Sequence, residues 1–267
     1  MKIFLFIASV TALCAGSAIP TIPGDNSHYV EGESRYIWMP DGDGVPHLVD
    51  LEEPADPTIL NDAIILEHLL CLQIYFIVTF LRSNPNNHQV IVNGNANSVR
   101  NSNYVGSRGL KVVVHGWNSN GNSQLNPTIT SALLAQGNFN VIVVDWRALA
   151  NSNYATAAGG VPSVGQHLGN FLQWLINTGG GNWNNVHLIG FSLGAHIVGN
   201  AGRQVGEYII NITANALNRN AGTYVEAIHT DGGILGIFDP IGNADFYPNG
   251  GRNPMPGFTG FLMMCQR

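Results

Sequence analysis

Charged residues are scarce in this sequence. Asp, Glu, Lys and Arg together account for 10% of its 267 residues, whereas an average globular domain has about a quarter. The formal net charge is −6, and no cluster of basic residues offsets this acidic balance. A nucleic-acid-binding protein needs a positively charged face to meet phosphates. The composition therefore argues against a nucleic-acid partner.

Cysteine is also scarce, with three residues in the whole chain. Cys14 lies in an N-terminal apolar segment, so Cys71 and Cys265 remain, and the sequence leaves open whether they pair. No metal-ligand spacing and no phosphate-binding glycine loop is present. The stretch Asp41–Gly44 lacks the remaining ligands of a calcium loop and is predicted to form a turn. We expect no metal and no cofactor.

Apolar runs long enough to cross a membrane are absent too. The run Ile3–Leu13 follows Lys2 and precedes the small residues Ala15–Ala18, which is typical of a secretory signal peptide cut near Ala18. A second apolar stretch, 61–81, is interrupted by polar residues. We therefore expect a secreted, extracellular protein with no transmembrane segment. The sequon Asn211–Thr213 is a candidate glycosylation site.

The chain divides into three parts by composition. Residues 1–18 are the predicted signal peptide. Residues 19–60 are rich in Gly, Pro and acids, which indicates an N-terminal extension with little regular structure, and a pro-segment is one interpretation of it. Residues 61–267 are expected to form the main domain. Its first part is dense in apolar residues and fits a helix passing into a strand near Gln73–Leu81.

Strands and helices alternate from about residue 88. Apolar runs predict strands at 89–92, 110–114 and 141–144, and at the stretch ending at Gly190. Helical spacing predicts helices at 128–136, 162–177 and 195–204. Continuously apolar strands that alternate with helices are typical of an α/β fold with a mostly parallel sheet. Ligands of such sheets bind at the carboxyl ends of strands, where Trp117, Asp145 and Ser192 are expected.

The strongest motif is G-x-S-x-G, present as Gly190–Gly194. An apolar run precedes it and a small-residue helix follows it, so Ser192 is predicted to lie on a tight strand-to-helix turn that exposes its hydroxyl as a nucleophile. The helix N-terminus supplies amide N–H groups for a developing oxyanion. Leu193, directly after the serine, and Trp117, in the loop after a buried strand, are candidate oxyanion-hole donors.

Six stretches together resemble the pancreatic lipase family, which includes triacylglycerol lipases, phospholipases A1 and insect relatives. They occur in family order, and the N-terminal extension is most similar to insect members. The stretches are 82–85, 114–119, 140–146, 190–196, 225–231 and 244–251. The resemblance implies an α/β-hydrolase fold with helices on both faces of the sheet. It also implies cleavage of lipid esters through an acyl-enzyme on Ser192, with the amides of Trp117 and Leu193 as the oxyanion hole.

The other two members of the family's Ser-Asp-His triad have no match here. The family's acid lies soon after the nucleophile helix, but this chain passes from Gly206–Ala214 into Asn215–Asn220 without an Asp, and no histidine follows His229. Asp231 is a surrogate candidate for the acid, with a turn or capping role as the alternative. No base is found, since His115, His196 and His229 are expected to be hydrogen-bonded core residues.

Two functions therefore stay open. The first is a secreted serine ester hydrolase of the triacylglycerol lipase or phospholipase A1 type, in a form that lacks part of the C-terminal region, with doubtful activity without its acid and base. Its partner is a lipid ester substrate or a lipid interface. The second is a non-catalytic lipase-like protein that binds or carries lipid, as some insect yolk proteins do.

Overall fold

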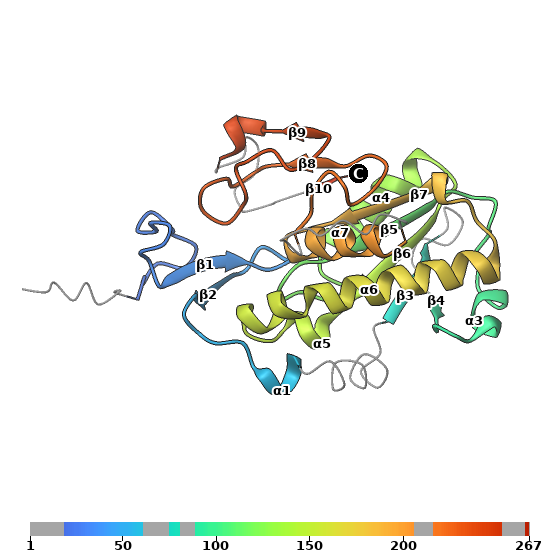
Figure 1. Ribbon diagram of the computed structural model, residues 1–267, viewed down its shortest axis with the longest axis horizontal. Coiled ribbons are helices and arrows are strands. Elements are labelled where there is room, and N and C mark those ends of the chain that lie inside the picture. The colour runs from blue at the N-terminus through green and yellow to red at the C-terminus, as the bar shows by residue number, and fades with distance from the viewer. Residues whose placement is uncertain (1–18, 61–74, 81–88, 206–215, 253–264, 267) are drawn as a thin grey trace, which may run out of the picture.

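The computed structural model describes residues 19–60, 75–80, 89–205, 216–252 and 265–266. Within these ranges a six-stranded sheet has the order β10–β7–β5–β6–β3–β4, and two two-stranded sheets accompany it (Figure 1). The strands are β1 (Tyr36–Pro40), β2 (Pro46–Asp50), β3 (Tyr75–Phe80), β4 (Gln89–Ile91), β5 (Leu110–Val114), β6 (Asn140–Asp145), β7 (Val186–Gly190), β8 (Glu226–Ile228), β9 (Ala244–Phe246) and β10 (Cys265–Gln266). The α-helices are α1 (Pro57–Leu60), α3 (Ala96–Arg100), α4 (Leu125–Gln136), α5 (Arg147–Ala150), α6 (Tyr154–Gly179) and α7 (Leu193–Val205).

The centre of the main sheet is parallel, as predicted. β5 pairs in parallel with both β6 and β7. β3 is antiparallel to β6 and β4 is antiparallel to β3, so β4 again runs in the direction of the central strands. At the opposite edge, β10 is antiparallel to β7. The central strands thus all end at the same edge of the sheet, which is where α/β proteins place their sites.

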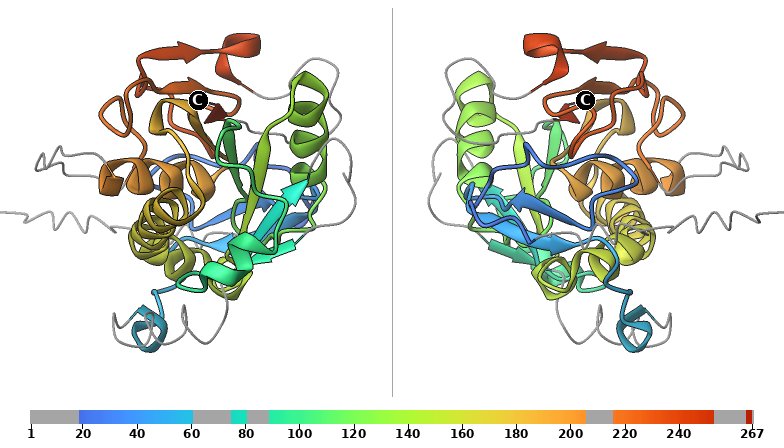
Figure 2. Two further views of the ribbon diagram at one scale, coloured as in Figure 1. Left: turned by 90° about the vertical axis from the view of Figure 1, so that its right-hand side faces the viewer. Right: turned by 90° about the vertical axis from the view of Figure 1, so that its left-hand side faces the viewer.

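Helices cover both faces of this sheet, which confirms the predicted layers. Alternate residues of a strand point to opposite faces: Val112 and Val114 of β5 pack in the core cluster that contains α6 and α7, whereas Val113 packs in the cluster that contains α4. Every residue of β6 is buried, as expected for a strand with helices on both faces. Figure 2 shows α4 on one side of the sheet and α6 with α7 on the other.

The N-terminal extension differs from the prediction. Its stretch 36–50 forms an antiparallel hairpin of β1 and β2, in which Ile37 pairs with Val49. Both side chains are buried in the same core cluster as α6 and α7. The turn at Asp41–Gly44 is confirmed, because the Asp41 carboxylate accepts hydrogen bonds from the amides of Asp43 and Val45 at 2.9 Å each. The Gly, Pro and acid content of the segment obscured two short strands that are stabilised by burial against the rest of the protein.

Helix α6 begins eight residues before its predicted start at Pro162, at Tyr154. Asn153 caps its N-terminus by accepting a hydrogen bond from the Thr156 amide at 2.8 Å. The added turns are rich in Ala and Gly, whose small side chains allow close packing: a Cβ on Gly160 would overlap Leu149 of α5. Proline is disfavoured inside a helix, so the sequence pattern predicted that the helix starts at Pro162. In the structure the helix continues through Pro162, and the close packing of its first turns stabilises it.

Candidate functional site

Ser192 lies in a two-residue turn between β7, which ends at Gly190, and α7, which begins at Leu193. Its φ angle is 53°, in the left-handed region that few non-glycine residues adopt. Two backbone hydrogen bonds close the turn, from the Gly194 amide to the Phe191 carbonyl (2.8 Å) and from the Ala195 amide to the Ser192 carbonyl (2.9 Å). A non-glycine residue is held in this conformation only where its surroundings over-determine it, and functional sites are where such strain gathers.

The two glycines of the motif allow the backbones around this turn to touch. A Cβ on Gly190 would lie 2.2 Å from the Gly194 carbonyl oxygen, and one on Gly194 would lie 2.4 Å from the Val114 carbonyl oxygen. Any side chain at either position would therefore push α7 away from β7 and β5. The two glycines thus prevent collisions that any other residue would cause.

The 115–124 loop, which follows β5, lies directly against the serine. A Cβ on Gly116 would be 2.8 Å from the Ser192 Cβ and 3.1 Å from the Phe191 carbonyl oxygen. Within the described ranges, the backbone amides of Trp117 and Leu193 donate to no protein acceptor. Leu193 is the first residue of α7, where an amide has no intrahelical partner. Two amides next to Ser192 thus remain available to an incoming group.

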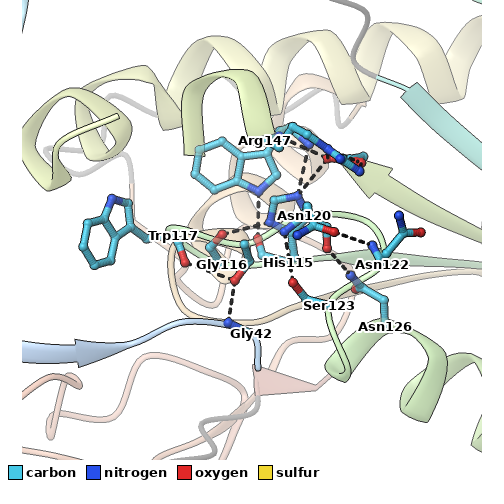
Figure 3. Close-up of polar contacts among 12 residues, drawn as sticks. Gly42, His115, Gly116, Trp117, Asn120, Asn122, Ser123, Asn126 and Arg147 are labelled. Carbon is cyan, nitrogen blue, oxygen red and sulfur yellow. Dashed lines mark hydrogen bonds and ion pairs between the residues drawn. The ribbon is translucent and has the colours of Figure 1, made fainter. Parts of the chain in front are cut away.

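His115 controls the orientation of the first of these amides (Figure 3). Its Nδ1 lies 2.8 Å from the Gly116 carbonyl oxygen, and because a carbonyl only accepts, Nδ1 carries a proton and donates it. The peptide bond between Gly116 and Trp117 is planar and trans, so the Trp117 N–H points opposite to the carbonyl that His115 holds. The imidazole is completely buried and stacks on Trp146, with ring centroids 5.6 Å apart. His115 is therefore a structural residue of this loop.

The other side of Trp117 is held as firmly. Asn118 has a left-handed φ of 48°, and its amide donates to the Ala150 carbonyl at 2.8 Å. The indole Nε1 of Trp117 donates to the Ser152 carbonyl at 2.9 Å. The loop is thus bonded to backbone carbonyls of α5 and of the turn between α5 and α6.

Asp145, at the end of β6, is buried beside the His115 ring. Burial alone would raise the pKa of its carboxyl, but hydrogen bonds with His115 and Arg147 outweigh burial and hold that pKa well below its usual range. Its Oδ1 lies 3.4 Å from the His115 Nε2, and the Arg147 guanidinium binds it through two nitrogens. Asp145 is thus an ionised structural group at the end of β6.

Ser192 lines a mainly apolar pocket. Its walls come from the start of α6, from α7 and from the segment around β8, and the lining residues are Tyr154, Ser192, Leu193, Ala195, His196, Leu217, Ile228, His229, Leu235, Gly236, Ile237 and Ile241. A pocket of apolar side chains with a few polar groups is typical of a small-molecule site. Here the polar side chains are the serine, two histidines and a tyrosine.

Neither pocket histidine presents an acceptor nitrogen to the serine. The Nδ1 of His196 accepts the Leu217 amide at 3.0 Å, which leaves Nε2 as a donor in the neutral ring. Burial, together with the nearby charge of Arg203, lowers the pKa of His196. His229 has an acceptor on each nitrogen, the Ile237 carbonyl oxygen at 2.6 Å and the Asp245 carboxylate at 2.8 Å. A general base for Ser192 needs a free lone pair, and neither ring provides one.

The sequence analysis missed the partnership of His229 with Asp245. Burial raises the pKa of the Asp245 carboxyl, but hydrogen bonds from His229 and from the amides of Ile241 and Gly242 lower it further than burial raises it. The His229 ring also stacks on Tyr247, with centroids 4.4 Å apart. Both residues lie in stretches that carry the family resemblance. They are 16 residues apart in the chain, however, and no local sequence motif predicts a hydrogen bond between side chains at that separation.

Asp231, the surrogate candidate for the acid, lies in a turn after β8. The strand before it, β8, pairs with β9 in a separate two-stranded sheet, so Asp231 does not follow a strand of the main sheet. Its side chain is buried and is not among the residues that line the Ser192 pocket. Its backbone carbonyl accepts the amides of Ile234 and Gly236, which closes a turn.

Several predicted features lie outside the described residues: the signal peptide, the helix expected after residue 60, Cys71 and the sequon asparagine Asn211. Cys265 is in β10, opposite Gly190 of β7. No helix within the described ranges is long and apolar enough to cross a membrane. In the same ranges, no three or more His, Cys, Asp and Glu residues come together as a metal site.

The parallel sheet covered by helices on both faces and the sharp strand-to-helix turn at Ser192 define an α/β-hydrolase fold. The family model described as Lipase matches residues 66–265, and the chain belongs to the pancreatic lipase family. It is 32% identical over 198 residues to the pancreatic triacylglycerol lipase of Mus musculus, which covers 67% of this chain.

Two further relatives show similar agreement. Pancreatic lipase-related protein 2 of Bos taurus is 33% identical over 198 residues, and lipoprotein lipase of the same species is 32% identical over 182 residues, or 60% of this chain. The matched part spans 42% of the mouse lipase and 38% of the lipoprotein lipase. The chain thus corresponds to about two fifths of the length of these relatives.

Proposed function

We propose that this protein hydrolyses carboxylic ester bonds of lipids, with Ser192 as the nucleophile and the amides of Trp117 and Leu193 as the oxyanion hole. The observation that carries the proposal is the left-handed Ser192, which lines an apolar pocket and is close in the chain or in space to the Leu193 and Trp117 amides, neither of which has a protein acceptor among the described residues. Apolar walls suit an acyl chain, and the family's named members act on triacylglycerols and lipoproteins. The substrate is accordingly a triacylglycerol or a phospholipid, as for a lipase or a phospholipase A1.

The chemistry follows from these groups. The Ser192 hydroxyl oxygen attacks the ester carbonyl carbon, and the carbonyl oxygen becomes an oxyanion that accepts the two amide hydrogens. Collapse of this intermediate releases the alcohol and leaves an acyl group on Ser192, which water then removes as the fatty acid. The serine proton must pass to a base, and neither His196 nor His229 accepts it in this arrangement. Solvent water therefore takes the proton and returns it to the oxygen of the departing alcohol. We therefore expect turnover well below that of a complete triad, whose loss typically costs about 10⁶-fold.

The test compares the wild-type protein with Ser192→Ala on fluorogenic short-chain and long-chain esters. The wild type should hydrolyse the esters faster than the variant, because only the wild type can form the acyl-enzyme on Ser192. A fluorophosphonate probe should label Ser192 in the wild type, as read by peptide mass spectrometry. Equal hydrolysis by the two proteins, with no label on Ser192, would refute the catalytic proposal. Triolein and phosphatidylcholine as alternative substrates decide between the lipase and the phospholipase A1 type.

A non-catalytic, lipid-binding role is the second candidate. It is favoured by the hydrogen bonds of His196 and His229, which leave Ser192 without a base on the described pocket wall. Binding of a fluorescent fatty acid distinguishes the two functions. Under the second candidate, wild type and Ser192→Ala bind it with equal affinity and neither hydrolyses esters.

We further propose that the protein is secreted, with residues 1–18 removed, residues 19–60 as an N-terminal extension and residues 61–267 as the lipase-like domain. The neutral-to-acidic composition supports a partner other than nucleic acid. Expression in a secreting cell should yield medium protein that begins near Ile19 and that loses mass on deglycosylation if Asn211 is used. Retention of residues 1–18 in that material would contradict the proposed processing.

A further inference from the structure

We propose that the β1–β2 hairpin is a clamp that holds the 115–124 loop in place and thereby positions Trp117 beside Ser192. This inference rests on the proposed function, because it takes the Trp117 amide as a donor to the oxyanion. Under this proposal the segment 36–50 contributes to the catalytic site, and Ser119 is the positioning residue through which the hairpin affects Trp117.

The hairpin is anchored in the protein core. Ile37 and Val49 face each other across its two strands, and both are buried in the cluster that also contains Trp117 and Leu193. Its free end, the 41–45 turn, is closed by the Asp41 carboxylate and the Val45 amide. A short hairpin is marginal by itself, so its conformation depends on these contacts, and the loop that it touches depends on it in return.

The turn contacts the loop through a relay of two hydrogen bonds, drawn in Figure 3. The Gly42 amide donates to the Ser119 Oγ at 2.5 Å, and the same hydroxyl donates to the Trp117 carbonyl at 3.1 Å. Ser119 is 2% exposed, so water does not replace either bond. The carbonyl of Trp117 is thus connected through one hydroxyl to the backbone of the hairpin.

Two further contacts lie on either side of this relay. The Asp43 carboxylate accepts the Gln124 amide at 2.6 Å, at the N-terminal end of α4, where an acidic group is favourable. The His47 ring packs edge-on against the Trp117 indole, with centroids 6.0 Å apart, and its Nε2 lies 2.9 Å from the Asp41 carboxylate. The hairpin therefore meets the loop near its start, at its middle and at its end.

These contacts complete the restraint on Trp117. His115 holds the peptide plane before this residue, through the Gly116 carbonyl. Ser119 and Ala150 hold the plane after it, through the Trp117 carbonyl and the Asn118 amide. Each peptide is planar, so the first plane carries the Trp117 N–H and the second carries the Trp117 carbonyl and the Asn118 amide. The two planes meet at the Trp117 Cα, which is therefore held from both sides. Preorganised donors of this kind do not reorganise during the reaction.

The decisive variant is Ser119→Ala, which removes the relay and leaves the Gly42 amide and the Trp117 carbonyl without this partner. Ser123→Ala is the matched control. Ser123 is a buried serine of the same loop, but its hydroxyl accepts the Asn120 amide within the loop at 3.2 Å and makes no bond to the hairpin. Ser119→Thr keeps the hydroxyl and tests for rescue. Gly42→Ala is a second disrupting variant, because its Cβ would lie 2.7 Å from the Ser119 Oγ.

The first readout is Ser192-dependent hydrolysis of a soluble short-chain ester. Ser119→Ala should lower kcat by about 10-fold to 100-fold with KM nearly unchanged, since small misplacements of catalytic groups have effects of that size. Gly42→Ala should lower kcat in the same direction, whereas Ser123→Ala and Ser119→Thr should stay within about 3-fold of the wild type. Equal kcat values for Ser119→Ala and Ser123→Ala would overturn the clamp.

The second readout, hydrogen exchange of the Asn118 amide, does not depend on catalysis. Exchange should be faster in Ser119→Ala than in Ser123→Ala, because loss of the relay frees the peptide that this amide belongs to. Unchanged exchange in Ser119→Ala would overturn the clamp even if the enzyme is active. If the wild type shows no Ser192-dependent hydrolysis, the proposed function fails, and the exchange comparison alone decides whether the hairpin holds the loop.

Discussion

The Nδ1 of His115 and the carbonyl oxygen of Gly116 are 2.8 Å apart, and both belong to adjacent residues of one chain. This bond holds the peptide whose other end is the Trp117 amide. By holding the Gly116 carbonyl, His115 thus orients the Trp117 amide at the other end of the same peptide, close to Ser192. A fully buried histidine that does not act as a general base can therefore still determine where an oxyanion donor points.

Replacing His115 should separate the orientation of this peptide from the rest of the fold. His115→Asn retains an N–H donor near the Nδ1 position, whereas His115→Leu has nearly the same shape without a donor. We expect His115→Leu to lower Ser192-dependent kcat by about 10²-fold more than His115→Asn, with similar KM values, because one oxyanion donor contributes about that much. Equal rates for the two variants in the short-chain ester assay would show that the bond has no effect.

Gly116→Ala tests the contact between the 115–124 loop and the serine. Its Cβ would be 2.8 Å from the Ser192 Cβ, so the loop must shift, and we expect a loss of about 1–3 kcal/mol in the free energy of unfolding. Gly222→Ala is the control, since no atom lies closer than 3.7 Å to its Cβ. Urea unfolding of the two variants should show a clear gap, and comparable stability would indicate that the loop adapts freely.

Asp145→Asn should show a stability loss that depends on pH. The folded-state pKa of Asp145 is below its ordinary value, despite burial, because of His115 and Arg147. Its ionised form therefore stabilises the protein above the unfolded pKa of about 3.9, and this contribution is lost as the pH falls through the folded pKa. We expect the variant to be about 1–3 kcal/mol less stable than the wild type at pH 7. Urea titrations at pH 7 and pH 3 should show the gap narrowing in acid.

His196→Asn should change the pH dependence of stability in a higher pH range than Asp145→Asn. Burial and the Arg203 charge lower the folded-state pKa of His196, so below the unfolded pKa of about 6.5 the unfolded chain binds a proton that the folded ring resists. Stability then decreases as the pH falls from 7 to 5. Asparagine does not titrate and keeps an acceptor for the Leu217 amide, so thermal unfolding of His196→Asn should depend less on pH in this range. An unaltered pH dependence would assign the effect to other groups.

Local patterns predicted the centre of the fold closely. The runs predicted at 110–114 and 141–144 became β5 and β6 because continuously apolar segments need burial on both faces, which the centre of an α/β sheet provides. The Gly190–Gly194 motif identified the serine turn for a similarly local reason, since a left-handed residue between two close-packed glycines has few alternatives. Strands outside the main sheet were less predictable, because β1 and β2 lie in a stretch whose composition is typical of loops.

The amino-acid sequence by itself determined the family, the serine turn and the positions of the central strands along the chain, because each of these follows from contiguous residues with a strict steric or burial requirement. Only the tertiary structure decided which distant groups meet there. It paired His229 with Asp245, removed Asp231 from the main sheet and placed the Gly42 amide on the hydroxyl of Ser119. Such contacts depend on how separate segments pack, and a hydrogen bond between residues 77 positions apart has no local pattern in the chain.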